Sequence, residues 1–456
     1  MDTKFHLHCR KCGADIPGFK EWFANNQKCP HCGGTYVDVK YHRDYSELKK
    51  LIDTKEHVEN VWHYFDFLPL IDKKNEISHT EGAIPVDRWE FMEKFAKKYY
   101  NLDITVRAYR NDLNQGTGTF KDVAGAVTAS VLKENGVKDY CVASTGNIAN
   151  AFAHYFAEAG INLGVFVPED TLKINEAEIN TYGQGLFRVK GDYAMAKKVA
   201  ADYSAKYGIL ISGGNTDPMR VEAKKTMVFE WLRQMGKLPT VYIQAVSGGT
   251  GPIAIAKGCA DLEGLGYDNR LPRFIMVQPS GCTPMVEGYA KAKAAGFPEG
   301  WQNDYPCYEN PKTSVPILAT GKPGTFPIVA SLVKESGGDF VAFDEQYLAD
   351  MAKLVAYETT VRIGPAAAVC VGGFFESLKN GLLKNGDDVL INLGEGGGRR
   401  AGPAAEATRR NPGDSIRGSS DPRALGKAGG RCCPERRGVC PRCSDNSAVR
   451  DRGSSP

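Results

Sequence analysis

Short apolar runs alternate with longer amphipathic segments between about residues 85 and 400. Each apolar run has the length of a strand, and the segment that follows has the spacing and length of a helix. The predicted strands lie at residues 139–144, 162–168, 185–191, 240–249, 273–281 and 388–398. Such alternation is typical of parallel sheets that helices cover on both faces, so the pattern predicts an α/β fold with two sheets. Ligands of such folds bind at the carboxyl ends of the strands, where the glycine-rich turns of this chain fall.

Length and composition add a domain count and exclude some classes of partner. A chain of 456 residues exceeds one hydrophobic core, so we expect two domains of ordinary size with appendages. With 42% hydrophobic residues, 24% charged residues and a net charge of +3, nothing indicates binding to nucleic acid or to a membrane surface. No apolar run approaches the roughly 18 residues of a membrane helix. We therefore expect a cytoplasmic protein.

Cysteines gather at the two ends of the chain. Near the start, two C-x-x-C pairs, each followed by glycine, supply Cys9, Cys12, Cys29 and Cys32. This spacing predicts a zinc ribbon over residues 1–40, with a structural ion because four thiolates leave no open position for water. The neighbouring His6, His8 and His31 are not needed as ligands.

The segment 401–456 differs in composition from the rest of the chain. It is rich in Arg, Gly, Pro and Ser and has no aromatic residue, so we expect it to be disordered. The change at "GGGRRAGP" is abrupt, which suggests the hypothesis of a shifted reading frame. No apolar scaffold surrounds the cysteines of this segment, which argues against a second metal site. The remaining cysteines are expected to fill space in the core; they are Cys141, Cys259, Cys282, Cys307 and Cys370.

One lysine occupies an unusual place in the stretch "NQGTGTFKDVAG". Lys121 follows a turn that Gly116 and Gly118 make possible, and it opens a helix rich in small residues. An amine placed in this way is poorly solvated, which favours loss of its proton and formation of a Schiff base. The alternative, a lysine that extends to solvent from a helix start, is equally compatible with this motif alone.

Two further turns have the composition of anion sites at helix N-termini. "ASTGN" follows a predicted strand and opens a helix with Ser144, Thr145, Gly146 and Asn147, which suits a substrate carboxylate. "VSGGTG" repeats the arrangement at Ser247 to Gly251, where glycines let backbone N–H groups converge on a phosphate. A reactive lysine, a phosphate turn and a carboxylate turn in one α/β chain together indicate pyridoxal phosphate and an amino-acid substrate.

These motifs resemble those of the fold-type II pyridoxal-phosphate enzymes, and within them the threonine synthases. The lysine stretch is similar to the family's Asn-Pro-Thr-Gly-Ser-Phe-Lys-Asp motif, with Gln115 at the proline position. "NTDPMRVEAKKTMVFEW" is similar to the Asn-Pro-x-Arg-x-Glu-Gly-x-Lys-Thr helix of threonine synthases. "QAVSGGTGPI" and the terminal Gly-Gly-Gly resemble cysteate synthase, a related enzyme that replaces the phosphate of O-phosphoserine with sulfite. Some relatives also carry an N-terminal zinc ribbon.

The resemblance implies a role for each matching residue. Lys121 would bind the cofactor and act as acid and base on Cα, and Asn147 would contact the cofactor's 3-hydroxyl. The cofactor phosphate would bind at Gly248, Gly249, Thr250 and Gly251. The substrate carboxylate would bind at Ser144, Thr145 and Gly146. Arg220 and Lys224 lie one turn apart on a predicted helix, where a phosphate-bearing substrate could use them; for Lys224 we favour an ordinary solvated basic face.

One departure from the family concerns the pyridine nitrogen of the cofactor. Relatives commonly place a Ser or Thr hydroxyl opposite it, whereas Leu393 stands at the nearest matching position here and Asn392 is the polar residue beside it. The resemblance therefore leaves the partner of that nitrogen open, with Asn392 as the candidate.

The resemblance implies a fold of the tryptophan-synthase-beta-like type: a zinc ribbon over residues 1–40, an α/β domain over 41–225 with the lysine and the substrate turn, and a second α/β domain over 226–400 with the phosphate turn. It implies a synthase that expels phosphate from an O-phosphorylated amino acid and adds a nucleophile. Threonine from O-phosphohomoserine and water is the leading case. The alternatives are β-replacement on O-phosphoserine by sulfite, and a decayed relative that only binds or senses amino acids. Relatives often dimerise, so the resemblance leaves a homodimer open for this chain.

Overall fold

The computed structural model describes residues 4–144, 146–169, 171 and 173–397. The predicted disordered segment 401–456, with its four cysteines, and Thr145 lie outside the described residues. Within the described part, the structure confirms the predicted α/β fold with parallel sheets. A small cysteine-bearing sheet precedes them in the sequence. None of the described helices is long and apolar enough to cross a membrane.

The larger sheet has the strand order β12-β11-β10-β13-β5-β4. Its strands are β12 (Asp339–Phe343), β11 (Arg273–Pro279), β10 (Val241–Ala245), β13 (Asp388–Asn392), β5 (Thr105–Tyr109) and β4 (Val86–Arg88). Every neighbouring pair is parallel except the edge pair β4 and β5. The carboxyl ends of β10, β11 and β13 therefore meet at one edge of the sheet, which is where ligands of such sheets bind.

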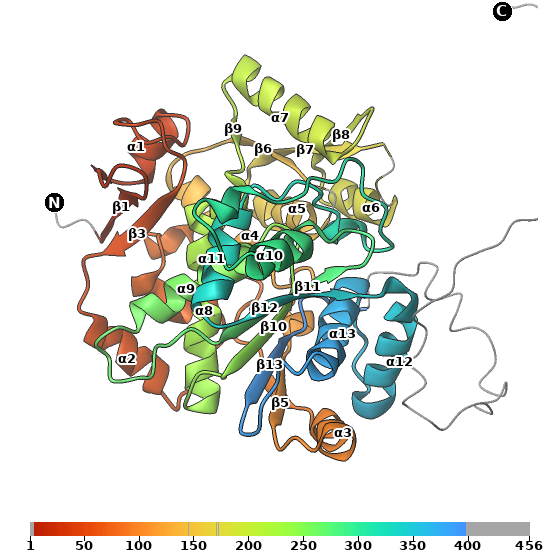
Figure 1. Ribbon diagram of the computed structural model, residues 1–456. Coiled ribbons are helices and arrows are strands. Elements are labelled where there is room, and N and C mark those ends of the chain that lie inside the picture. Colours follow the sequence, from red (N-terminus) through yellow and green to blue (C-terminus); the bar gives the residue numbers. More distant parts are fainter. Residues whose placement is uncertain (1–3, 145, 170, 172, 398–456) are drawn as a thin grey trace, which may run out of the picture. The chain divides into compact units, whose positions relative to one another are not determined.

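Helices bury both faces of this sheet (Figure 1). Successive strand residues alternate between two cores, so Val241 and Ile243 pack on one face and Tyr242 on the other. One face is covered by α3 (Glu90–Tyr100), α12 (Leu348–Thr359) and α13 (Pro365–Lys379). The other is covered by α8 (Pro218–Met235), α9 (Thr250–Asp261), α10 (Pro284–Ala294) and α11 (Phe326–Glu335). This two-sided burial explains why the strands are continuous apolar runs in the sequence.

The smaller sheet is entirely parallel and has the order β8-β7-β6-β9. Its strands are β8 (Gly185–Val189), β7 (Asn162–Pro168), β6 (Asp139–Ala143) and β9 (Leu210–Ile211). Helix α7 (Tyr193–Tyr207) packs on one face, with α5 (Asn147–Ala159) on the other (Figure 1). Two further helices, α4 (Asp122–Glu134) and α6 (Lys173–Thr181), pack against α5. Helix α4 also packs against α8, so these helices connect the two sheets.

The sheets do not follow the predicted domain ranges. Strands β4 and β5 lie at residues 86–109, inside the range predicted for the first α/β domain, yet they pair with β13 from the second. A division at residue 225 therefore cuts across the larger sheet. The hydrophobic pattern also does not single out β4, β5, β9 or β12, of which β9 and β4 are only two and three residues long.

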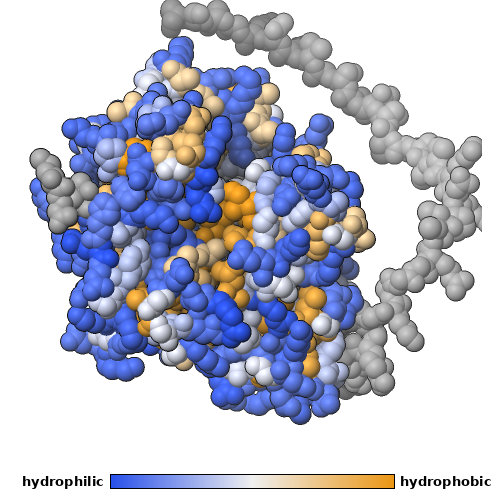
Figure 2. Space-filling view, turned by 60° about the vertical axis from the view of Figure 1, so that its left-hand side comes forward, coloured by the Kyte–Doolittle hydropathy of each residue, from blue (hydrophilic) through white to orange (hydrophobic). Residues whose placement is uncertain are grey.

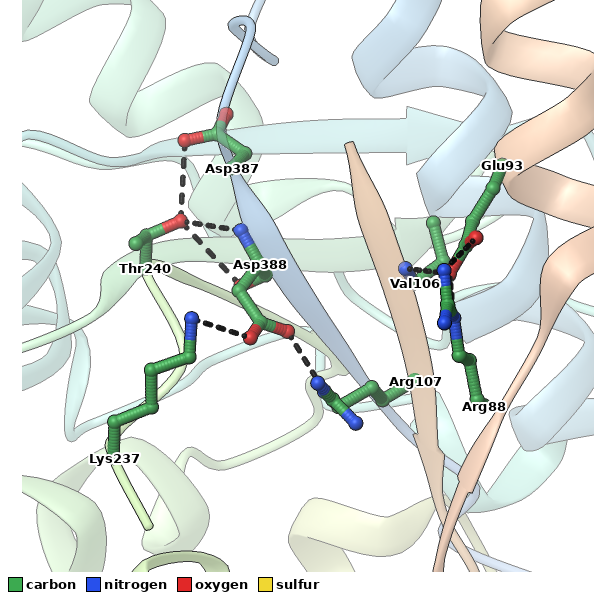
Figure 3. Close-up of polar contacts among 8 residues, drawn as sticks. All are labelled: Arg88, Glu93, Val106, Arg107, Lys237, Thr240, Asp387 and Asp388. Atoms are coloured by element: carbon green, nitrogen blue, oxygen red, sulfur yellow. Dashed lines mark hydrogen bonds and ion pairs between the residues drawn. The ribbon is translucent and has the colours of Figure 1, made fainter. Parts of the chain in front are cut away.

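A polar network ties together the ends of β13, β10 and β5 that lie opposite the ligand-binding edge (Figure 3). Asp388, at the start of β13, is paired with Arg107 of β5 and with Lys237, at 2.9 and 3.1 Å. Thr240 accepts a hydrogen bond from the Asp388 backbone N–H and donates one to Asp387. Because Asp388 is buried, its pairs with Arg107 and Lys237 compensate a carboxylate that would otherwise be costly to enclose.

The N-terminal ribbon is an antiparallel sheet of order β2-β1-β3, and it packs against α8. Its elements are β1 (Phe5–Cys9), β2 (Asp15–Ile16), α1 (Phe19–Ala24) and β3 (Val37–Tyr41), followed by α2 (Tyr45–Asp53). The hydroxyl of Tyr41 donates a hydrogen bond to Glu222 of α8 at 2.8 Å. Glu222 and Asp261 of α9 both pair with the fully buried Lys225, whose amine lies 4.2 Å from the Tyr41 ring centroid. Ribbon, α8 and α9 thus share one buried ionic cluster.

The surface is predominantly hydrophilic, with hydrophobic residues gathered in the middle of the face that Figure 2 shows.

Replacing Lys225 tests how strongly this cluster holds the ribbon, α8 and α9 together. Lys225→Met leaves two buried carboxylates with less compensating charge, so we expect the free energy of unfolding to fall by about 3–5 kcal/mol. Chemical denaturation measures the loss. The control is Lys198→Met, which breaks the exposed pair of Lys198 with Asp202 and should change little. Equal stabilities of the two variants would contradict the assignment.

Candidate active site

The loop before α4 is held in place by hydrogen bonds that its own side chains make. Asp122, fully buried at the start of α4, accepts from the backbone N–H of Thr117 at 2.7 Å and from that of Thr119 at 3.3 Å. Gly118 has a φ of 63°, which favours glycine, and a Cβ at Gly116 would meet the Tyr155 hydroxyl at 2.6 Å. The glycines and the carboxylate together fix where Lys121 leaves the backbone.

The same loop is bonded to the segment that follows β13, which is distant in the sequence. The N–H of Phe120 donates to the carbonyl of Gly394 at 3.2 Å, and the N–H of Gly396 donates to the carbonyl of Gly118 at 2.9 Å. Thr119 and Glu395 form an antiparallel bridge between these bonds. The loop that carries Lys121, called the lysine loop below, is therefore hydrogen-bonded to the chain that leaves the carboxyl end of β13 in the larger sheet.

Lys121 is half-buried, with its amine 3.5 Å from the ring centroid of Phe120. Burial and, after it, the positive charge of Arg220 lower the pKa of Lys121 to about 7, against the opposing effect of the negative charge of Glu395. A large share of the amine is therefore uncharged near neutral pH, as a nucleophile requires.

Arg220 and Lys224 are both buried, which corrects the solvated face predicted for Lys224. The exposed fractions are 6% for Arg220 and 0% for Lys224. Arg220 reaches Ser212 at 3.4 Å, and neither its Nε nor the Lys224 Nζ has a hydrogen-bond partner among the described residues. Burial is the largest cause lowering the pKa of each, and for Lys224 the charges of Lys121 and Arg220 add to it. The prediction for Lys224 fails because it was based on how often charged residues occupy solvated helix faces, which does not reveal which other segments pack over this helix.

The turn before α5 carries the predicted carboxylate site. Ser144 is buried after β6, and its hydroxyl accepts from the N–H of Gly146 at 3.2 Å. A Cβ at Gly146 would meet Ile317 at 2.4 Å, so only glycine fits this position. Asn147 donates from its amide to Glu395 at 2.7 Å, and the other Glu395 oxygen accepts from the N–H of Ala366 at the start of α13. Glu395 thus orients Asn147.

The glycines before α9 form a cradle that side chains would fill. Gly249 has a φ of 83°, and a Cβ there would lie 2.4 Å from Val329. A Cβ at Gly248 would lie 1.9 Å from the amide of Asn215, and one at Gly251 would lie 2.1 Å from Gln244. The Thr250 hydroxyl donates to Asn215 at 2.8 Å. Backbone N–H groups at this helix start can therefore approach an anion closely.

One cavity of about 500 Å³ brings the predicted residues together. Its lining includes Lys121, Ser144, Gly146, Asn147, Arg220, Gly248, Gly249, Thr250, Gly251 and Asn392. The volume is within the range of small-molecule sites. An amine, a glycine cradle and a polar turn around one cavity fit pyridoxal phosphate, whereas Lys224 lies behind the lining.

Asn392 and Leu393 face opposite ways at the end of β13. The side chain of Asn392 lines the cavity and accepts from the amide of Asn111 at 2.7 Å, while Leu393 is fully buried in the core on the α13 face. Alternation along the strand produces this arrangement. Asn392, rather than Leu393, is therefore the side chain available to the cofactor ring.

Three polar residues of the site are missed by the sequence analysis: Asn215, Gln244 and Glu395. Asn215 and Gln244 line the cavity beside the glycine cradle, and Glu395 holds Asn147. Each lies at or just after the carboxyl end of a strand, β9, β10 or β13. That position is the signal that could have identified them.

The four ribbon cysteines converge on one point. The Sγ distances are 3.6 Å between Cys9 and Cys32 and 3.7 Å between Cys12 and Cys29, and all four sulfurs lie within 4.8 Å of one another. Thiolates about 2.3 Å from a tetrahedral ion would be about 3.8 Å apart, so the cluster fits a metal.

Of the cysteines expected to fill the core, Cys141, Cys259, Cys282 and Cys370 are buried. Cys307 is exposed, which corrects that expectation for this residue.

Comparison with known proteins agrees with this geometry. The sequence pattern of the family described as "Pyridoxal-phosphate dependent enzyme" matches residues 85–395. The threonine synthase of Methanocaldococcus jannaschii is 27% identical over 416 residues, covering 87% of this chain and 95% of that protein. The cysteate synthase of Methanothrix thermoacetophila is 30% identical over 409 residues, covering 87% of this chain and 92% of that protein.

Solved structures show the same fold at lower identity. Threonine deaminase isoform 2 from Solanum lycopersicum has a TM-score of 0.56 at 17% identity and covers 81% of this chain and 95% of its own. A pyridoxal 5'-phosphate-dependent aspartate racemase has a TM-score of 0.56 at 17% identity, covering 70% of this chain and 91% of its own. The chain therefore belongs to the family of pyridoxal-phosphate-dependent enzymes, of the fold-type II kind that the threonine and cysteate synthases share.

Proposed function

We propose that the chain is a synthase that expels phosphate from an O-phosphorylated amino acid and adds a nucleophile, with threonine formation from O-phosphohomoserine and water as the leading case. The observation that carries the proposal is one cavity that joins Lys121, a glycine cradle and the buried guanidinium of Arg220. A cofactor phosphate in the cradle leaves Arg220 for a second anion. A substrate that carries its own phosphate supplies that anion.

Lys121 is the residue that reacts. Its lowered pKa lets the amine bind the cofactor aldehyde and later remove the proton from Cα of the substrate. When bound, pyridoxal phosphate withdraws electrons from Cα and so makes that proton more acidic. Ser144 and Gly146 are placed to bind the substrate carboxylate, and Asn147, held by Glu395, to contact the cofactor ring.

Arg220 binds the leaving phosphate in this proposal. Its Nε lacks a hydrogen-bond partner among the described residues, and Asp217, the carboxylate at the start of α8, already accepts backbone N–H groups of that helix. A guanidinium left with open donors in a buried site recognises a phosphate by charge-assisted hydrogen bonds. The buried Lys224 behind it adds positive potential.

Replacement of phosphate by sulfite on O-phosphoserine is the second candidate. It is favoured by the 30% identity to the cysteate synthase of M. thermoacetophila and by the Gly-Gly-Gly sequence at 396–398, directly after the matched region. For the ribbon we propose a structural Zn²⁺ held by Cys9, Cys12, Cys29 and Cys32, because four thiolates select a tetrahedral soft ion. The cytoplasmic location and the homodimer stay predictions.

Replacing Lys121 tests its role directly. Lys121→Ala should abolish the visible absorbance of the lysine-bound cofactor and turnover together, because Lys121 is the lysine that we assign to the cofactor aldehyde. Absorbance spectra of the purified variants measure the effect. Lys197→Ala, which removes another lysine from the cavity lining, should keep the absorbance. An undiminished band in Lys121→Ala would refute the assignment.

The pH dependence of cofactor binding follows from the Lys121 pKa of about 7. Only the uncharged amine attacks the aldehyde, so the rate at which cofactor-free protein regains its absorbance should rise with pH through about 7 and level off above it. Arg220→Met removes a neighbouring positive charge, which favours the protonated amine, so the midpoint should move to higher pH. A rate that keeps climbing past pH 9 in the unmodified protein would mean an ordinary lysine.

Phosphate release separates the candidate substrates. O-phosphohomoserine alone should release phosphate and yield threonine; release from O-phosphoserine that requires sulfite would favour the second candidate. Arg220→Met should lower kcat/KM by about 10- to 100-fold through the lost charged hydrogen bonds. Arg233→Met, on the same helix but outside the cavity lining and paired with Glu230, is the matched control. If the protein releases phosphate from neither substrate, the proposed function is excluded, and a protein that only binds amino acids is favoured.

A further inference from the structure

The ribbon contributes a wall of the active-site cavity. Five of its residues, which surround the second C-x-x-C pair, line the same cavity as Lys121 and Arg220: Trp22, Asn26, Gln27, Lys28 and Thr35. Trp22 is buried in the ribbon core, while Asn26 and Lys28 are exposed. A structural module that only stabilised the fold would not need to reach the site where substrate binds.

A specific bond fixes this wall to the catalytic part of the chain. The side-chain amide of Gln27 donates to the carbonyl of Ile211 at 2.6 Å, and Gln27 is 9% exposed. Ile211 ends β9, and the next residue, Ser212, is the one that Arg220 contacts. The ribbon therefore touches the loop whose Ser212 contacts Arg220.

The backbone at this contact has an unusual conformation. Asn26 and Gln27 have φ values of 51° and 57°, in the left-handed region that favours glycine. Their N–H groups donate to the carbonyls of Phe23 and Trp22, which turns the chain sharply at the end of α1. Two consecutive non-glycine residues keep such a conformation only where their surroundings determine it, and such positions gather at functional sites.

This segment leads directly into the second C-x-x-C pair. Lys28 directly precedes Cys29, whose N–H donates to the carbonyl of Gly34 at 2.7 Å and whose Sγ lies 3.7 Å from that of Cys12. A metal bound by the four cysteines would therefore hold Asn26, Gln27 and Lys28 against the cavity.

We propose that the segment from Asn26 to Lys28 is part of the substrate site and that Lys28 is a specificity-determining residue, which draws the anionic substrate into the cavity. This inference rests on the proposed function for the identity of the substrate. A flexible cation at the rim of a cavity raises the local concentration of an anion and its rate of entry. Where a ribbon metal holds this segment in its cavity-lining position, metal binding and occupancy of the cavity strengthen each other, and linkage requires the same factor in both directions.

A pair of lysine variants tests the role of Lys28. Lys28→Ala should lower kcat/KM for O-phosphohomoserine by about 3- to 10-fold, mainly through KM, with the cofactor absorbance and kcat unchanged. The defect should shrink at high salt, because salt screens the attraction. Lys11→Ala is the matched control: Lys11 is equally exposed and directly precedes Cys12, but lies outside the cavity lining. An unaffected Lys28→Ala, or equal losses in both variants, would overturn the inference.

Metal retention tests the coupling without turnover. The cofactor-loaded protein should lose its ribbon metal to a chelator several-fold more slowly when inorganic phosphate or O-phosphohomoserine fills the cavity, and Lys28→Ala should reduce that protection. Equal rates of metal loss with and without either anion would refute the coupling. If no phosphorylated amino acid is turned over, the proposed function fails, while protection of the metal by inorganic phosphate still supports the ribbon as a wall of the cavity.

Discussion

The arrangement of the active site depends on cations taken out of water. Lys121 and Lys224 have their amines 3.5 and 5.6 Å from the ring centroid of one phenylalanine, Phe120, and Arg220 is buried close by. Enclosing charge without a partner is costly, so the amines favour their neutral forms and the guanidinium favours an anion. This single constraint accounts both for the reactivity that we propose for Lys121 and for the proposed substrate, which brings its own negative charge.

The fold maintains this arrangement by joining segments that are distant in the sequence. The loop that carries Lys121 bonds to the segment after β13, and Glu395 of that segment holds Asn147 from the smaller sheet. Arg220 begins α8, which the buried Lys225 cluster ties to α9 and to the ribbon. The larger sheet, the smaller sheet and the ribbon thus meet at one cavity, and buried or partly buried hydrogen bonds and ion pairs hold them there. The ribbon, which at first looks like an appendage, supplies one of the walls.

Local sequence was sufficient wherever a residue's role follows from its immediate neighbours. The strands β6, β7, β10, β11 and β13 can be predicted because both of their faces are buried, and glycine-containing turns follow all of them except β7. The cysteine cluster can be predicted from the two C-x-x-C pairs because each short turn places two thiolates side by side. Lys224 is the counterexample: it stands on a helix with many charged residues, yet it is buried, with its amine 5.6 Å from the ring centroid of Phe120 in the lysine loop.

The sequence by itself therefore determined the α/β class, the cysteine ribbon and the family, and it pointed to Lys121 and to the two turns that we propose as anion sites. Only the tertiary structure decided that β4 and β5 join the later strands, that Glu395 and Asn215 enter the site, and that Asn26 to Lys28 border the cavity. The physical reason is the range of the interactions. Periodicity, turns and metal spacing act over a few residues, whereas strand order and the burial of charge arise from contacts between segments up to hundreds of residues apart.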